Sequence, residues 1–67
     1  MKKELMKYCV MDSPDGDDEY IITYESSLKM ARKQLSAARR VDIRNKEKSV
    51  YYVIRLADSW EVVYRVN

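Results

Sequence analysis

The sequence of 67 residues contains no histidine and only one cysteine, one glycine and one proline. Without histidine, the usual zinc sites of histidine and cysteine cannot form, and acid–base catalysis near neutral pH loses its commonest residue. Cys9 has no partner for an internal disulfide and no obvious base beside it. A single glycine excludes glycine-rich phosphate-binding loops. We therefore expect a protein that is not an enzyme and that needs no metal or other cofactor.

Long apolar runs are also absent. No stretch reaches the roughly 18 apolar residues of a membrane-spanning helix, and the basic start at Lys2 and Lys3 is not followed by the apolar run of a signal peptide. The hydrophobic fraction of 46% is nevertheless high enough for a packed core. These features predict a single domain covering residues 1–67, located in a reducing cytoplasm.

Residues 26–41 form the one segment with a sustained helical period. At 100° per residue, the apolar half of this segment comprises Leu28, Met30, Ala31, Leu35, Ala37, Ala38 and Val41. Ser26 or Ser27 can serve as the N-cap. We expect an amphipathic helix, followed by a polar surface connection over residues 42–49.

The remaining segments are typical of strands. Residues 4–11 and 20–24 are rich in strand-forming residues, and the acidic turn between them holds Pro14 and Gly16. The inward set of the first strand is Met6, Tyr8 and Val10. Residues 50–57 and 60–66 alternate more clearly. The expected fold is α+β, with a single helix packed on one four-stranded antiparallel sheet in β-β-α-β-β order.

The register of the second hairpin follows from its apolar pattern. A three-residue loop over residues 57–59 would place Leu56 opposite Trp60 and bring the two apolar sets onto one face. That face, directed at the helix, comprises Val50, Tyr52, Ile54, Leu56, Trp60, Val62, Tyr64 and Val66. The opposite face is expected to be open and mixed, with Tyr51, Val53, Arg55, Glu61, Val63 and Arg65.

The net charge of +2 conceals two oppositely charged segments. Residues 1–25 carry three lysines against seven acids, a net charge of −4, whereas residues 26–48 carry eight basic residues against two acids, a net charge of +6. Residues 49–67 are balanced. Because the Debye length in physiological salt is about 8 Å, each segment presents its own sign to a nearby partner.

Three groups of residues are candidates for binding a partner. The first is a basic group on the helix and the connection after it, suited to nucleic acid or to another partner: Lys29, Arg32, Lys33, Arg39, Arg40, Arg44, Lys46 and Lys48. The second is the acidic hairpin tip, suited to a basic channel: Asp12, Asp15, Asp17, Asp18 and Glu19. The third is a stacking surface on the open sheet face: Tyr51, Arg55 and Arg65.

Each candidate has a structural explanation as well. Basic residues solvate a helix exterior, acidic residues keep a turn soluble, and tyrosines are ordinary cross-strand partners. The acidic tip lacks the spacing of a calcium loop, because Met11 and Ser13 stand where carboxylates or amides are needed.

The order of elements resembles small phage-encoded proteins of bacterial viruses, among them several anti-CRISPR proteins, in which two hairpins flank one helix. The resemblance rests on the helix opening at Ser27-Leu28-Lys29-Met30-Ala31-Arg32-Lys33, directly after a short strand, and on the strand from Val50 to Leu56 that turns into one containing Trp60. It carries over no functional residue. It implies a non-enzymatic inhibitor that occupies the nucleic-acid-binding surface of a bacterial defence complex in the host cytoplasm.

Three functions are therefore open. The leading expectation is an inhibitor of this type, which would bind a nucleoprotein complex through the acidic tip or an exposed sheet edge together with the basic group. The alternative is a stand-alone nucleic-acid-binding module that uses the basic helix face. A third possibility is a structural subunit or homodimer that pairs edge strands.

Overall fold

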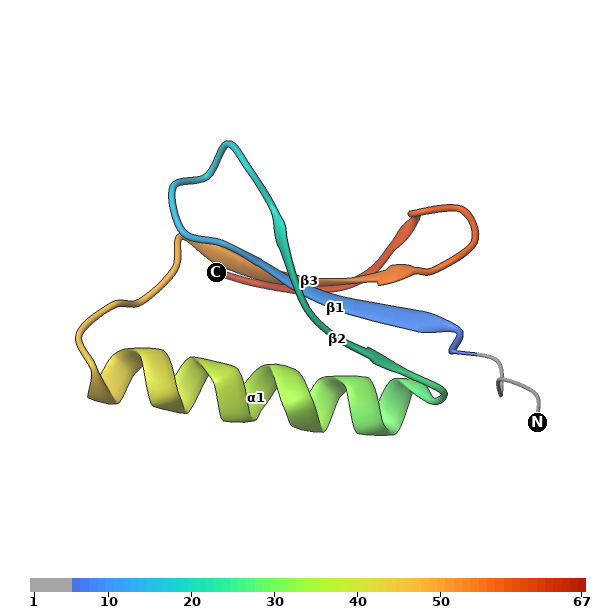
Figure 1. The fold of residues 1–67 in the computed structure, drawn as a ribbon, viewed down its shortest axis with the longest axis horizontal. Coiled ribbons are helices and arrows are strands. Elements are labelled where there is room, and N and C mark those ends of the chain that lie inside the picture. Colours follow the sequence, from blue (N-terminus) through green and yellow to red (C-terminus); the bar gives the residue numbers. More distant parts are fainter. Residues whose placement is uncertain (1–5) are drawn as a thin grey trace.

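The computed structural model describes residues 6–67 and contains one helix and a four-stranded antiparallel sheet (Figure 1). The elements in chain order are β1 (Tyr8–Ser13), β2 (Tyr20–Glu25), α1 (Leu28–Arg44), β3 (Tyr51–Leu56) and β4 (Val62–Val66). The α+β class and the β-β-α-β-β order are confirmed. Part of the first expected strand, residues 4 and 5, lies outside the described residues, and Met6 precedes β1 and is exposed.

The strands are arranged in the order β2-β1-β3-β4. The two hairpins are therefore joined through the antiparallel pairing of β1 with β3, which extends from Tyr8 opposite Leu56 to Ser13 opposite Tyr51. Helix α1 lies along one face of this sheet, and both hairpin connections rise on the other side (Figure 1). Strands β2 and β4 form the two edges.

The helix begins where the sequence predicts and ends later. Ser27 is the N-cap, and its Oγ accepts a hydrogen bond of 3.2 Å from the backbone N–H of Met30. The helix continues beyond Val41 to Arg44, so the connection is shorter than expected. The reason is that Asp42 lies on the sheet-facing side, where its carboxylate accepts a hydrogen bond from the hydroxyl of Tyr52.

The main core lies between the helix and the sheet. It is formed by the buried side chains of Val10, Ala31, Leu35, Tyr52 and Ile54, and Tyr8, Leu28, Ala38, Tyr64 and Val66 pack around them. The predicted helix-facing positions of β3 and β4 are confirmed for these members. Met30 and Val41 are exposed, because a single helix leaves its flanks uncovered.

The register expected for the second hairpin is wrong. The loop has four residues, since Leu56 donates a backbone hydrogen bond to Glu61 and Trp60 adopts a left-handed conformation at φ 62°. A bulge between Ile54 and Arg55 then shifts the pairing, which places Ile54 opposite Tyr64. The bulge brings Tyr64 and Val66 onto the helix-facing side with Ile54 and Tyr52, but it leaves Val62 opposite Arg55 on the other face. Val62 and Trp60, both expected to face the helix, are 44% and 46% exposed.

The opposite sheet face is less open than expected. Cys9, Met11 and Val53 form a second buried cluster there, with Tyr51 packed against it. Val53 is only 1% exposed. The sheet is thus covered on both faces, by the helix on one side and by long polar side chains on the other.

The hydroxyl of Tyr52 provides a test of the main core. It donates to Asp42 and accepts a hydrogen bond of 3.3 Å from the backbone N–H of Ser49. Tyr52→Phe should lower the free energy of unfolding by about 1 to 3 kcal/mol in urea denaturation, because both partners lose a buried hydrogen bond. Tyr20→Phe is the matched control, since Tyr20 is 55% exposed. Equal effects of the two substitutions would contradict this account of Tyr52.

Candidate functional site

The basic residues on α1 and on the connection after it form a surface that we call the basic ridge. Its members are Lys29, Arg32, Lys33, Arg39, Arg40, Arg44, Lys46 and Lys48. All of them except Arg39 are exposed. The one ion pair within residues 6–67 joins Arg55 to Glu19, so no cation of the ridge is paired with a described carboxylate. The ridge therefore carries uncompensated positive charge.

The ridge is displaced toward one side of the helix. The guanidinium of Arg32 lies 4.5 Å from the ring centroid of Tyr64 on β4, which is a cation–π contact. Helix α1 packs against β1, β2 and β3, whereas the backbone of β4 lies beyond it. On a helical wheel, Arg39 lies beside Arg32 on the β4 side of the helix. Lys29 and Arg40 lie farther round, toward the back of the helix. The basic surface therefore extends from the exposed back of α1 toward the β4 edge.

Arg39 differs from the rest of the ridge. Its side chain is half-buried, and its Nε is buried without a hydrogen-bond partner. The prediction that it lies on the exposed face is therefore wrong. Since packing already restricts this side chain, Arg39 loses less conformational freedom than a mobile lysine when it contacts an anion.

The acidic hairpin tip is smaller than predicted. Asp12 lies within β1, where its Oδ2 accepts a hydrogen bond of 2.7 Å from the hydroxyl of Ser49. Asp15 accepts backbone hydrogen bonds from Asp17 and Asp18 at 2.9 and 3.0 Å, and these bonds lower its pKa. The loop turns at Gly16, which has φ 86°, as its position in the turn predicts. Within residues 6–67, Asp17 and Asp18 are the two of these five acids whose carboxylates accept no hydrogen bond.

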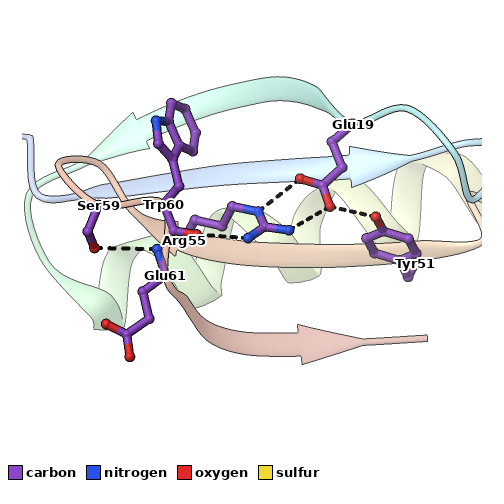
Figure 2. A network of polar contacts seen from close by, with 6 residues as sticks. All are labelled: Glu19, Tyr51, Arg55, Ser59, Trp60 and Glu61. Carbon is purple, nitrogen blue, oxygen red and sulfur yellow. Dashed lines mark hydrogen bonds and ion pairs between the residues drawn. The ribbon is translucent and has the colours of Figure 1, made fainter.

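Glu19 belongs to a different site, on the sheet face opposite the helix (Figure 2). Its two carboxylate oxygens accept hydrogen bonds from Nε and Nη2 of Arg55, both at 2.9 Å. The hydroxyl of Tyr51 donates to the same carboxylate, and Nη1 of Arg55 donates to the carbonyl of Trp60 at 2.8 Å. The hydrogen bonds from Arg55 and Tyr51 lower the pKa of Glu19, and those same contacts raise the pKa values of Arg55 and Tyr51.

The predicted stacking surface is therefore already occupied. Tyr51, Arg55 and Arg65 do come together, but the nitrogens of Arg55 are engaged within the molecule. The guanidinium of Arg65 covers the ring of Tyr51 at 4.1 Å and also donates to Asn67 at 3.1 Å. A nucleobase could stack on Tyr51 only by displacing Arg65. The site stabilises the first hairpin against the second half of the chain.

The described residues offer little for catalysis or metal binding. Cys9 is buried on this second face, and burial raises the pKa of its thiol, which keeps it protonated. Within residues 6–67, no group of three or more histidine, cysteine, aspartate or glutamate side chains could hold a metal ion. A mainly apolar hollow of about 450 Å³ lies beside the start of β1. Its lining is Met6, Lys7, Tyr8, Leu56, Ala57 and Asp58.

Comparisons with protein-family models, with curated proteins and with solved structures found no match to this chain. No helix among residues 6–67 is long and apolar enough to cross a membrane. Among the described residues, the basic ridge is the predicted group whose cations form no ion pair.

The contacts of two residues at these sites do not follow from the sequence. The alternation of β4 places Tyr64 against the core, but its contact with Arg32 depends on which flank of the helix faces β4. The position of Glu19 places it in the acidic tip, whereas its partner Arg55 is 36 residues away. Only the strand order β2-β1-β3-β4 shows that Arg55 and Glu19 lie close enough to form a pair.

The Glu19–Arg55 ion pair predicts a pH dependence of stability. Because the pKa of Glu19 is lower in the folded than in the unfolded state, the pair stabilises the protein above the ordinary glutamate pKa and loses this effect as the pH falls through the lowered value. Glu19→Gln should cost about 1 to 2 kcal/mol at pH 7. The difference from the unmodified protein should shrink in urea denaturation below about pH 4. Glu61→Gln, at an exposed position, should show no such trend.

Proposed function

We propose that this protein is a non-enzymatic nucleic-acid-binding module that contacts phosphates through the basic ridge. The observation that carries the proposal is the absence of any described carboxylate partner for the ridge cations. In a helix exterior that is merely solvated, acids and bases are usually interspersed and pair at i and i+4. Here residues 27–41 contain no acid. The charge is therefore available to a polyanion.

The dimensions of the ridge fit this role. A helix of 17 residues is about 25 Å long, so its cations can lie along several consecutive phosphates. Each phosphate contact releases condensed counterions, which supplies affinity without any reading of sequence. Arg32 is held against Tyr64, and Arg39 is held by burial, so the part of the ridge nearest β4 is already ordered before binding.

The geometry favours phosphate contacts over base contacts. The stacking surface on the opposite face is covered by Arg65, and the ridge carries no aromatic residue among its own members. Contacts of this kind position a protein on nucleic acid and carry no sequence information. We therefore expect binding with little sequence preference.

Fluorescence anisotropy with a labelled 20-nucleotide DNA duplex tests this function. The affinity should be micromolar at 50 mM salt and should fall about 100-fold by 200 mM salt, the dependence expected for about four phosphate contacts. Combined charge reversal at Arg32, Lys33 and Arg40 to glutamate should abolish binding.

The matched control reverses Lys2, Lys3 and Lys7 to glutamate, which changes the net charge by the same amount outside the ridge. This control should retain most of the binding. Equal losses in the two variants would show that net charge alone is responsible, and no binding of the unmodified protein at 50 mM salt would reject the proposal.

A second candidate is an inhibitor of the phage-encoded type that binds a bacterial nucleoprotein complex. The observation that favours it is the exposed apolar edge of the sheet at β2, a surface suited to protein rather than to phosphate. Capture from bacterial lysate with nuclease treatment tests it. The inhibitor function predicts a retained protein that survives the nuclease and is lost with Ile22→Lys. Retention only without nuclease would point to nucleic acid as the ligand.

A further inference from the structure

Strand β2 is an edge strand that presents apolar side chains to solvent. It is hydrogen-bonded to β1 on one side only. Tyr20, Ile21, Ile22 and Tyr24 are between 40% and 55% exposed. A row of unpaired backbone groups beside exposed apolar side chains is a template for pairing with another strand.

Strand β2 lacks the basic residues and proline that protect many edge strands. The segment Tyr20–Glu25 contains no lysine, arginine or proline. A bulge interrupts the pairing of β2 opposite Val10 and Met11, and another interrupts the pairing of β4 opposite Ile54 and Arg55, so bulges do not distinguish the two edges. The other edge, β4, carries Arg65 within the strand. Of the two edge strands, β2 is therefore the more open to pairing with an additional strand.

Acidic residues at both ends of β2 restrict its partner. Asp17 and Asp18 precede the strand and are exposed, and Glu25 ends it. In an antiparallel pair of two β2 strands, Asp18 of one copy would lie near Glu25 of the other at each end. Like charges at such positions oppose pairing. The same acids repel nucleic acid, so neither a second copy nor a polyanion suits this edge.

We propose that β2 binds an extended segment of another protein as a fifth strand of the sheet. The segment fits if it alternates apolar and small polar residues and carries lysine or arginine at both ends. Backbone hydrogen bonds would supply affinity, the apolar side chains would cover Ile21, Ile22 and Tyr24, and the terminal cations would face the flanking acids. This interaction does not depend on nucleic-acid binding by the basic ridge.

The test uses a synthetic peptide of sequence Lys-Val-Thr-Val-Thr-Val-Lys and the ¹⁵N-labelled full chain. Titration should shift the amide resonances of β2 and the adjoining β1 in two-dimensional NMR spectra, with a dissociation constant in the millimolar to micromolar range. Ile22→Lys should weaken binding at least 10-fold. Met30→Lys is the matched control, because Met30 is an exposed apolar residue of α1. It should leave binding unchanged.

Two altered peptides separate strand pairing from charge attraction. A version methylated at each internal backbone nitrogen keeps every side chain but cannot donate hydrogen bonds, and it should not bind. A version with glutamate in place of both lysines should bind at least 10-fold more weakly. Equal binding of either version would overturn the proposal, as would the absence of any shift in β2 at 5 mM peptide.

Two further measurements complete the test. The charge reversal at Arg32, Lys33 and Arg40 should leave peptide binding unchanged, so a failure of the nucleic-acid function is distinguishable from a failure of this inference. Analytical ultracentrifugation should show a monomer. A dimer that Ile22→Lys dissociates would assign β2 to a second copy and overturn the proposal.

Discussion

The antiparallel pairing of β1 with β3 joins the two halves of this chain into one sheet. Both strands are central, and both contribute buried side chains to each face. Tyr52 fixes the end of this pairing to the helix, because its hydroxyl contacts Asp42 of α1 and the backbone of Ser49. Ser49 in turn donates to Asp12 of β1, so one small group of hydrogen bonds connects the helix, the connection and both central strands. A domain of 67 residues has a narrow stability margin, which makes such connections important.

Local patterns in the sequence predict the helix and the strands well. Where the structure departs from the prediction, contacts between distant residues are the reason. The helix and its cap at Ser27 follow from a local period and one side chain. The later end of the helix depends on Asp42 meeting Tyr52, and the hairpin register depends on a bulge at Ile54 and Arg55. Neither can be read from spacing, since a bulge inserts an extra residue and reverses the alternation of faces beyond it, as it does between Val62 and Tyr64.

The same distinction applies to the candidate sites. The ridge follows from composition along one helix, so the sequence identifies its members, apart from the burial of Arg39. The acidic and stacking sites depend on which strands are neighbours. Once β1 lies between β2 and β3, the chain entering β2 brings Glu19 within reach of Arg55 across the sheet, and two predicted sites combine into one structural contact. The sequence alone suggests that Glu19 and Arg55 are free to bind a partner, but in the structure their charges neutralise each other.

This redistribution of charge separates the two proposed binding surfaces of the molecule. Glu19 and Arg55 neutralise each other on the face opposite the helix, so this pair contributes little to the surrounding field. The ridge extends toward β4, whereas Asp17, Asp18 and Glu25 flank β2 at the other edge of the sheet. In physiological salt, screening limits the electrostatic attraction of each charged region to about 8 Å. The ridge would therefore attract a polyanion, and the acids beside β2 a basic strand, independently of each other. The two proposals therefore place partners of opposite charge at different edges of the sheet, and one does not exclude the other.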